Sequence, residues 1–156
     1  MNAPTHQPLQ VTIQELQSIL TAYTSCQLQQ TTGSYNEQIR DGFQRVKDWA
    51  QQYGYDLSKL KVIGIPHTNG MQLIGYECAL EIPAAIPQDT EDVQIKQLPG
   101  GRYAILSLAK DPTTIGENIR RFFVEYVPQH QLIIDPKRPS YEVYYEYSMD
   151  FCVPIL

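Results

Sequence analysis

The sequence predicts an α+β domain built from two copies of a strand–strand–helix–strand–strand unit, packed as a pseudo-twofold pair. Three observations support this prediction. A Val-x-Ile-x-x-Leu pattern that begins at Val11 returns at Val93, 82 positions later. Helix-start patterns at Ser34 and Thr114 lie 80 positions apart. Residues 141–147 alternate as a strand does, because successive side chains of a strand point to opposite faces.

The bulk composition limits the classes of function. A length of 156 residues suits one domain with a sizeable core. The net charge is −5 and no cluster of basic residues exceeds Arg120-Arg121, which argues against direct nucleic-acid binding. The first ten residues do not resemble a signal peptide, and no apolar run has membrane-spanning length. We therefore expect a cytoplasmic protein that does not interact with membranes.

Cysteine and histidine usage predicts neither disulfides nor a metal centre. The cysteines, Cys26, Cys78 and Cys152, are odd in number and have no C-x-x-C spacing, so they are expected to be reduced and buried. The three histidines are scattered and have no partners at ligand spacing. No metal and no cofactor are predicted.

The opening of each unit is predicted to be a pair of strands. In the first copy these are residues 11–16 and 19–25, and in the second 93–98 and 102–108. A short amphipathic helix through the first copy competes with this interpretation, but Pro99-Gly100-Gly101 prevents the second copy from being helical throughout. The Gly100-Gly101 pair predicts a tight hairpin turn.

A helix is predicted next in each unit. Ser34 to Glu37 and Thr114 to Glu117 match the S/T-x-x-E capping box, in which each side chain binds a free backbone N–H of the helix start. The first apolar stripe ends at Gly54, which predicts a helix stop. The second is expected to end before Pro128. The stripes are Ile39, Phe43, Val46, Ala50 and Tyr53, and Ile115, Ile119, Phe122, Phe123 and Tyr126.

Two more strands are predicted to close each unit. The first unit has strands at 61–65 and 76–83 around a polar loop at 66–70, and the second has strands at 141–147 and 150–155. Residues 84–92, with Pro87 and three acids, form the expected linker. The single domain 1–156 thus divides into repeats at about 9–83 and 93–156. One unit leaves a sheet face bare, so the two should pack with helices on the outer faces of antiparallel sheets and a ligand groove at the centre.

The alternation in residues 141–147 defines a candidate site. The apolar set of Tyr141, Val143, Tyr145 and Tyr147 is expected to face the unit's own helix. The opposite set of Glu142, Tyr144 and Glu146 would then face the groove between the halves, where ligands usually bind. On pattern alone, charged residues that alternate along a strand usually form its solvated face; the repeat favours the groove.

The chain resembles the GyrI-like small-molecule-binding domain, also found as the effector-binding domain of AraC-type and MerR-type multidrug regulators. The resemblance spans Val11 to Ile155. It rests on the opening pattern, Gly33-Ser-Tyr35, Trp49-Ala-x-x-x-Gly54, Tyr76-Glu-Cys-Ala-Leu, Leu98-Pro-Gly-Gly-Arg-Tyr-Ala104, Tyr141-Glu-Val-Tyr144 and Val153-Pro-Ile155. It implies a groove between two halves and a carboxylate in the E-x-Y position, here Glu142, that contacts a ligand, often a hydrophobic cation. The shorter loop at 66–75 and the Gly75 that replaces a frequent arginine change the mouth of that groove.

We therefore expect a stand-alone binding protein, without a helix-turn-helix, that captures a hydrophobic or cationic small molecule. Glu142 would supply the counter-charge, and the other ligand-binding candidates are Tyr144, Tyr103, Tyr35, Trp49 and Glu146. Binding is preferred over catalysis because no Ser-His-Asp order, metal spacing or phosphate loop is present. The alternatives are a hydrolase of alkylating electrophiles, with Glu142 activating water, and a protein partner, such as an inhibited topoisomerase, bound at an edge strand.

Overall fold

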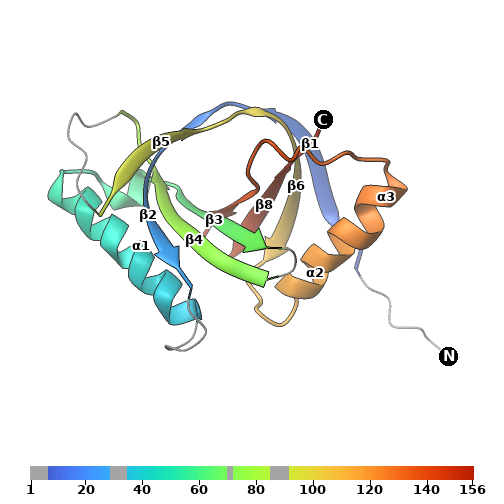
Figure 1. Cartoon of the computed structure of the whole chain (residues 1–156), viewed down its shortest axis with the longest axis horizontal. Coiled ribbons are helices and arrows are strands. Elements are labelled where there is room, and N and C mark those ends of the chain that lie inside the picture. Colours follow the sequence, from blue (N-terminus) through green and yellow to red (C-terminus); the bar gives the residue numbers. More distant parts are fainter. Residues whose placement is uncertain (1–6, 29–34, 70–71, 85–91) are drawn as a thin grey trace.

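The protein folds around one antiparallel sheet of eight strands with helices on its outer face (Figure 1). The computed structural model describes residues 7–28, 35–69, 72–84 and 92–156. The strands are β1 (Gln10–Leu16), β2 (Ile19–Gln27), β3 (Val62–Asn69), β4 (Gln72–Glu81), β5 (Gln94–Leu98), β6 (Gly101–Ala109), β7 (Tyr141–Tyr144) and β8 (Ser148–Pro154). The helical segments are α1 (Tyr35–Gln52), η1 (Leu57–Lys59), α2 (Ile115–Arg121), η2 (Phe122–Tyr126) and α3 (Val127–Gln129).

The order of strands across the sheet is β1-β6-β8-β7-β3-β4-β2-β5. Exchanging β1 to β4 with β5 to β8 leaves this order unchanged, as expected for two units of the same topology. Each unit gives its first strand to the other, because β1 pairs with β6 and β5 pairs with β2. The strand prediction for residues 11–16 is confirmed, and the competing helix is wrong. The repeat boundaries stay a prediction.

The hairpin predicted at Gly100-Gly101 is wrong, because β5 and β6 join there without pairing with each other. Gly100 instead lies against the link between β1 and β2. A Cβ at Gly100 would overlap the carbonyl oxygen of Leu16 and lie 2.7 Å from the backbone nitrogen of Ser18. Gly101 has φ +121°, a conformation that L side chains rarely adopt. The two glycines therefore allow the two inter-strand links to pass in close contact.

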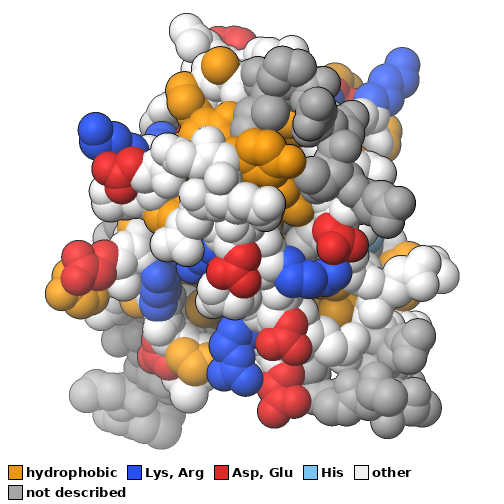
Figure 2. Space-filling view, turned by 90° about the vertical axis from the view of Figure 1, so that its left-hand side faces the viewer, with side chains coloured by type: hydrophobic (Ala, Val, Ile, Leu, Met, Phe, Trp, Pro, Cys, Tyr) orange, Lys and Arg blue, Asp and Glu red, His pale blue; other side chains and the backbone are white. Residues whose placement is uncertain are grey.

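Helix α1 covers one flank of the sheet (Figure 1). Its predicted stripe packs against the sheet through Phe43, Val46 and Ala50, and Gly54 ends the helix with φ +83°. The outer face of this flank carries charges of both signs side by side (Figure 2). The predicted cap at Ser34 lies outside the described residues.

The second flank carries α2, η2 and α3 as one continuous helical run with a π-helical turn in its middle. The predicted stop before Pro128 is wrong, because the helical run continues through Pro128 to Gln129. Thr114 precedes α2, but its hydroxyl makes no cap and donates to the carbonyl of Asp111 at 3.3 Å. The predicted side-chain cap by Thr114 is therefore wrong as well.

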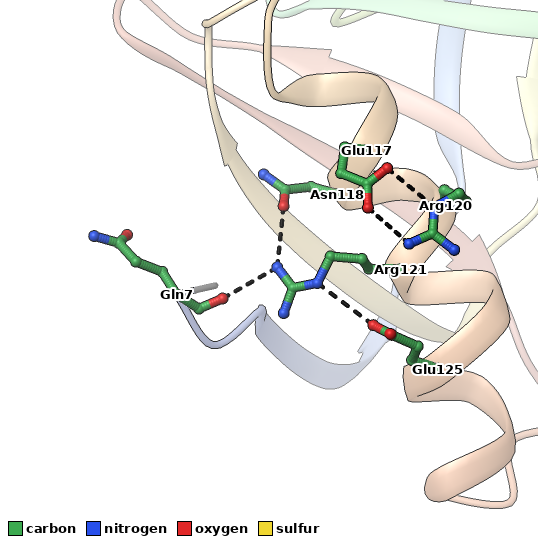
Figure 3. Close-up of polar contacts among 6 residues, drawn as sticks. All are labelled: Gln7, Glu117, Asn118, Arg120, Arg121 and Glu125. Atoms are coloured by element: carbon green, nitrogen blue, oxygen red, sulfur yellow. Dashed lines mark hydrogen bonds and ion pairs between the residues drawn. The ribbon is translucent and has the colours of Figure 1, made fainter. Parts of the chain in front are cut away.

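Arg121 joins this helical run to the segment before β1 (Figure 3). Its Nη1 donates to the carbonyl of Gln7 at 3.1 Å, and its Nε lies 3.4 Å from Glu125. The neighbouring Arg120 forms a two-pronged pair with Glu117. These contacts fix the start of β1 beside α2.

Two predicted boundaries shift in the strands that flank the centre of the sheet. The loop predicted at 66–70 is strand through Asn69, because β3 and β4 form a longer hairpin with a bulge between His67 and Thr68. The strand predicted at 141–147 ends at Tyr144. Beyond it Tyr145 is exposed, and 81% of Tyr147 is accessible to solvent.

The inner face of the curled sheet is a core made by strands alone. All eight strands contribute to this cluster, which includes Ile63, Tyr103 and Tyr141, and no helix residue belongs to it. Tyr141 and Val143 therefore face the inside of the curl, and the prediction that they face a helix is wrong. Glu142 and Tyr144 lie on the helix-bearing face instead. Among the described residues, no helix is long and apolar enough to cross a membrane.

Candidate functional site

Glu142 lies at the centre of the outer face, between the two helical flanks. It belongs to β7, whose neighbours are β3 and β8, and its register partners are Gly64 and Phe151. Tyr144 on the same strand packs with the cluster that α2 and η2 share with β6 and β8. Phe43 of α1 reaches the Tyr144 ring from the other flank. Glu142 therefore lies between the two helical flanks, but on the helix-bearing face and not on the face predicted to look away from the helix.

Three oxygen atoms form a closed triangle at this point. The Tyr76 hydroxyl donates to Glu142 Oε1 at 2.6 Å, and the Tyr144 hydroxyl donates to the same oxygen at 2.8 Å. The two hydroxyls are 2.9 Å apart. When Glu142 is ionised, the two tyrosine hydroxyls supply only two protons for the three contacts between these oxygen atoms. A protonated carboxyl supplies the third proton. Protonation of Glu142 at Oε1 would thus complete the ring of hydrogen bonds.

Gly64 is the reason Tyr76 can reach this carboxyl. Tyr76 belongs to β4, and β3 lies between β4 and β7 in the sheet. Its side chain must cross β3, and it does so at Gly64, where an added Cβ would overlap the Tyr76 hydroxyl. A glycine in a strand interior often marks such a close approach. Gly64 and Tyr76 together therefore position one of the two donors.

The triangle is covered from the α1 side by Phe43. The Phe43 ring packs edge-on against Tyr76 at 6.0 Å and against Tyr144 at 6.1 Å between ring centroids. Two hollows of about 200 and 910 Å³ occur elsewhere and include none of these residues in their lining. We take the triangle as the site because its chemistry is specific, whereas the hollows are open and mixed in polarity. A bulky ligand would have to displace the Phe43 ring to reach Glu142.

The protonation equilibria of the triangle are coupled. Burial raises the pKa of Glu142, while the hydrogen bonds from Tyr76 and Tyr144 oppose that rise. Burial and the neighbouring Glu142 charge raise the pKa of both tyrosines well above the usual range. The hydroxyls therefore remain protonated donors, and Glu142 is the member of the triangle that titrates. In the described part of the chain no cation pairs with it.

The other residues predicted for the site do not join the triangle. Tyr103 is fully buried on the inner face, where its hydroxyl donates to the carbonyl of Pro99 at 3.0 Å. Trp49 is a buried residue of α1 itself, and its ring stacks on Tyr55. Glu146 is exposed beyond the end of β7. The side chain of Tyr35 lies outside the described residues.

Sequence reasoning missed Tyr76, Gly64 and Phe43 as parts of the site. Tyr76 belongs to a strand motif and Phe43 to the apolar stripe of a helix, but neither pattern indicates a contact with residue 142. The one available signal was Gly64, a glycine inside a run of β-branched residues. No group of three or more His, Cys, Asp or Glu side chains suited to a metal occurs among the described residues.

The fold and the site define an α+β domain with a buried carboxyl between two helical flanks, a class suited to binding small molecules. The family model of the GyrI-like small molecule binding domain matches residues 11–154. The chain belongs to this family.

Relatives and solved structures agree with this assignment. The chain is 26% identical over 120 residues to YosT, an SPbeta prophage-derived protein of Bacillus subtilis (strain 168) classed as a candidate transcriptional regulator, covering 75% of this chain and 77% of YosT. It is similar in fold to EcmrR in a complex with DNA (TM-score 0.75, 9% identity, 94% of this chain), but it spans only 57% of that chain. SAV2435 bound to tetraphenylphosphonium has a TM-score of 0.57 and 16% identity, with 94% of each chain covered.

Proposed function

We propose that this protein binds a hydrophobic monocation at Glu142, with the rings of Tyr76, Tyr144 and Phe43 as the walls of the site. The observation that carries the proposal is the half-buried Glu142 carboxyl, which two tyrosine hydroxyls hold but no cation neutralises within the described residues. A desolvated carboxylate attracts a cation more strongly than a solvated one does.

The ligand class follows from the surroundings of the carboxyl. Both tyrosine hydroxyls donate to Oε1. The other carboxylate oxygen, Oε2, makes no hydrogen bond within the described part of the chain. Aromatic rings contribute roughly 0.5–2 kcal/mol when a cation lies over their faces. The similar structure of SAV2435 holds tetraphenylphosphonium, an aromatic cation. A delocalised cation with aryl groups fits a carboxylate that is ringed by aromatic side chains.

Titration calorimetry with tetraphenylphosphonium tests the proposal. Glu142→Gln removes the charge and keeps an acceptor for both hydroxyls, so we expect its affinity to fall by about tenfold or more. The affinity of the wild type should fall as the pH is lowered through the pKa of Glu142, because the proton and the cation compete for the same carboxylate. Binding should therefore release a proton at mildly acidic pH.

Two controls separate charge from shape. Glu15→Gln makes the same change in net charge on the exposed face of β1 and should leave the affinity unchanged. Triphenylphosphine oxide, which is neutral and similarly aromatic, should bind the wild type and Glu142→Gln equally weakly. The proposal is wrong if Glu142→Gln binds the cation as tightly as the wild type does.

A second candidate function is hydrolysis of a reactive electrophile. The raised pKa of Glu142 favours it, because a carboxylate with a raised pKa is a better general base for water. Turnover of a cyclopropane-bearing electrophile by the wild type, but not by Glu142→Gln, would establish hydrolysis. Absence of turnover by a wild type that binds tetraphenylphosphonium would leave binding alone.

A further inference from the structure

Two thiols lie side by side beneath α1, outside the Glu142 triangle. Cys26 of β2 and Cys78 of β4 place their Sγ atoms 4.0 Å apart on the helix-bearing face of the sheet. Both are buried. The Cys78 thiol donates to the carbonyl of Ile39 at 3.3 Å, and the Cys26 thiol donates to that of Gln38 at 3.8 Å. The pair therefore touches the first turns of α1, and the triangle uses neither sulfur.

The register of the strands does not favour a direct disulfide. Cys26 is opposite Tyr76 and Cys78 is opposite Thr24, so the two cysteines are diagonal neighbours on adjacent antiparallel strands. Diagonal pairs have Cα atoms about 7–8 Å apart, whereas a disulfide needs less than about 7 Å and an S–S bond of about 2.05 Å. One soft atom bonded to both sulfurs needs no such approach. With bonds of about 2.3 Å to each sulfur, such an atom spans up to about 4.6 Å, so sulfurs 4.0 Å apart need to approach far less than an S–S bond demands.

The surroundings decide which soft atom fits. Because no third His, Cys, Asp or Glu joins the pair among the described residues, a metal that requires four protein ligands is poorly served. Apart from Arg45, the neighbours are apolar or aromatic: Leu28, Tyr76, Ile39, Phe43 and Leu73. Such a site suits a neutral adduct that needs only two sulfurs and carries an organic group of its own.

We propose that Cys26 and Cys78 form a binding site for a trivalent arsenical that carries one organic group. Arsenic in such a compound forms one bond to carbon and two to sulfur, which matches two thiols with mostly apolar neighbours. The reaction condenses one R–As=O with two thiols to give R–As(S-Cys)₂ and one water molecule. Both thiol protons leave in that water, arsenic remains trivalent and no oxidant is needed.

Cys26 is the thiol at which the reaction begins. Its sulfur is close to the surface, since it accepts a hydrogen bond at 3.6 Å from Nη2 of Arg45, an exposed residue of α1. Cys78 is fully buried. Gly42 of α1 packs directly over the pair, where an added Cβ would lie 2.6 Å from Sγ of Cys26 and 2.7 Å from Sγ of Cys78. Inserting arsenic therefore requires α1 to move outward.

Intact-mass spectrometry of the folded protein treated with phenylarsine oxide tests the site. We expect one phenylarsenic group per chain, with the loss of one water molecule, and retention of that group in excess monothiol. A dithiol competitor should remove it. Cys26→Ala and Cys78→Ala should each retain the group roughly 10²-fold less well in monothiol, because the second bond is then missing.

Cys152→Ala is the matched control. Cys152 is also buried, but it lies on the inner face, so this variant should keep wild-type retention. The inference is overturned if native wild type takes up no arsenical, if uptake needs denaturant, or if the wild type loses the group to monothiol as readily as the single variants do. The result does not depend on the proposed cation site, because Glu142→Gln should bind the arsenical as the wild type does.

Discussion

Glu142 is the residue at which stability and the proposed binding make opposite demands. The folded chain holds its proton more tightly than the unfolded chain does, because burial raises the pKa of the carboxyl. Linkage then gives the sign: this group contributes stability at acid pH, and the contribution is lost as the pH rises through the folded-state pKa. A glutamine amide at this position would accept the same two hydrogen bonds without the cost of ionising a buried group.

Glu142→Gln should be more stable than the wild type at neutral pH. The amide oxygen can accept from Tyr76 and Tyr144, and no charge is buried. The advantage should shrink as the pH falls below the pKa of Glu142, because the wild type then becomes neutral too. Urea unfolding of both proteins across this pH range measures the difference. Equal midpoints at neutral pH, or a gap that persists unchanged in acid, would contradict this account.

Gly64→Ala should disturb the same triangle from the neighbouring strand, β3. The new methyl group occupies the path of the Tyr76 side chain, so we expect a loss of about 1–3 kcal/mol in the free energy of unfolding. The donor to Glu142 is displaced as well, so affinity for tetraphenylphosphonium should change.

The background Tyr76→Leu, which shortens the side chain that crosses Gly64, provides the control. In that background Gly64→Ala should cost much less, and the difference between the two costs measures the steric conflict in a double-mutant cycle. Equal costs in both backgrounds would show that Tyr76 is not what requires a glycine.

At the scale of elements, α1 contacts the two sulfurs of the sheet at Gly42, where a side chain would overlap them. Gly42 lets it settle onto the two sulfurs, and the next residue, Phe43, then reaches Tyr76 and Tyr144. Helix propensity alone favours alanine at position 42 by about 1 kcal/mol. The close approach of the thiols opposes that preference, and overpacking costs about 1–3 kcal/mol.

Gly42→Ala should therefore destabilise the wild type but stabilise a chain that also carries Cys26→Ala and Cys78→Ala. Removing both sulfurs frees the space for the methyl group, so only the gain in helix propensity remains. Thermal or urea unfolding of the four proteins gives both signs. A destabilisation in both backgrounds would mean that something other than the thiols holds α1 close.

Local pattern predicted the elements better than it predicted the faces they present. The alternation that predicts a strand at 141–147 and the apolar stripe of α1 are local patterns. Both elements form, but the strand ends at Tyr144 and Tyr53 of the stripe is exposed beyond the helix. The Gly100-Gly101 pair is compatible both with a hairpin turn and with two inter-strand links that pass in close contact. Which of the two occurs depends on which strands pair. Alternation separates the two faces of β7 but does not say which one meets the helices, because that depends on the direction in which the whole eight-stranded sheet curls. The Tyr76–Glu142 contact spans 66 positions and one intervening strand, and no periodicity carries it.

At the scale of the whole molecule, the two units are joined by exchanged strands as well as by the chain. β1 lies on the edge of β6, and β5 lies on the edge of β2. Glu77 of β4 reinforces the second contact through Lys96 of β5 and also contacts His67 Nε2 at 2.6 Å. The inner core draws on all eight strands. Neither unit keeps a closed core when the other is absent.

The chain should therefore stay folded after a cut between the units but should not fold as separate halves. With a protease site inserted at 85–91, cleavage under native conditions should leave a non-covalent complex that co-migrates with the uncut protein and retains its circular dichroism. Residues 1–84 and 92–156 expressed alone should lack cooperative unfolding, because each has lost a strand partner at both ends and half of the inner core. Mixing the two fragments should restore one cooperative transition, whose midpoint rises with concentration because association and folding are linked. Cooperative unfolding of either fragment alone would show that its core folds without the exchanged strands. The single domain would then consist of two independent folding units.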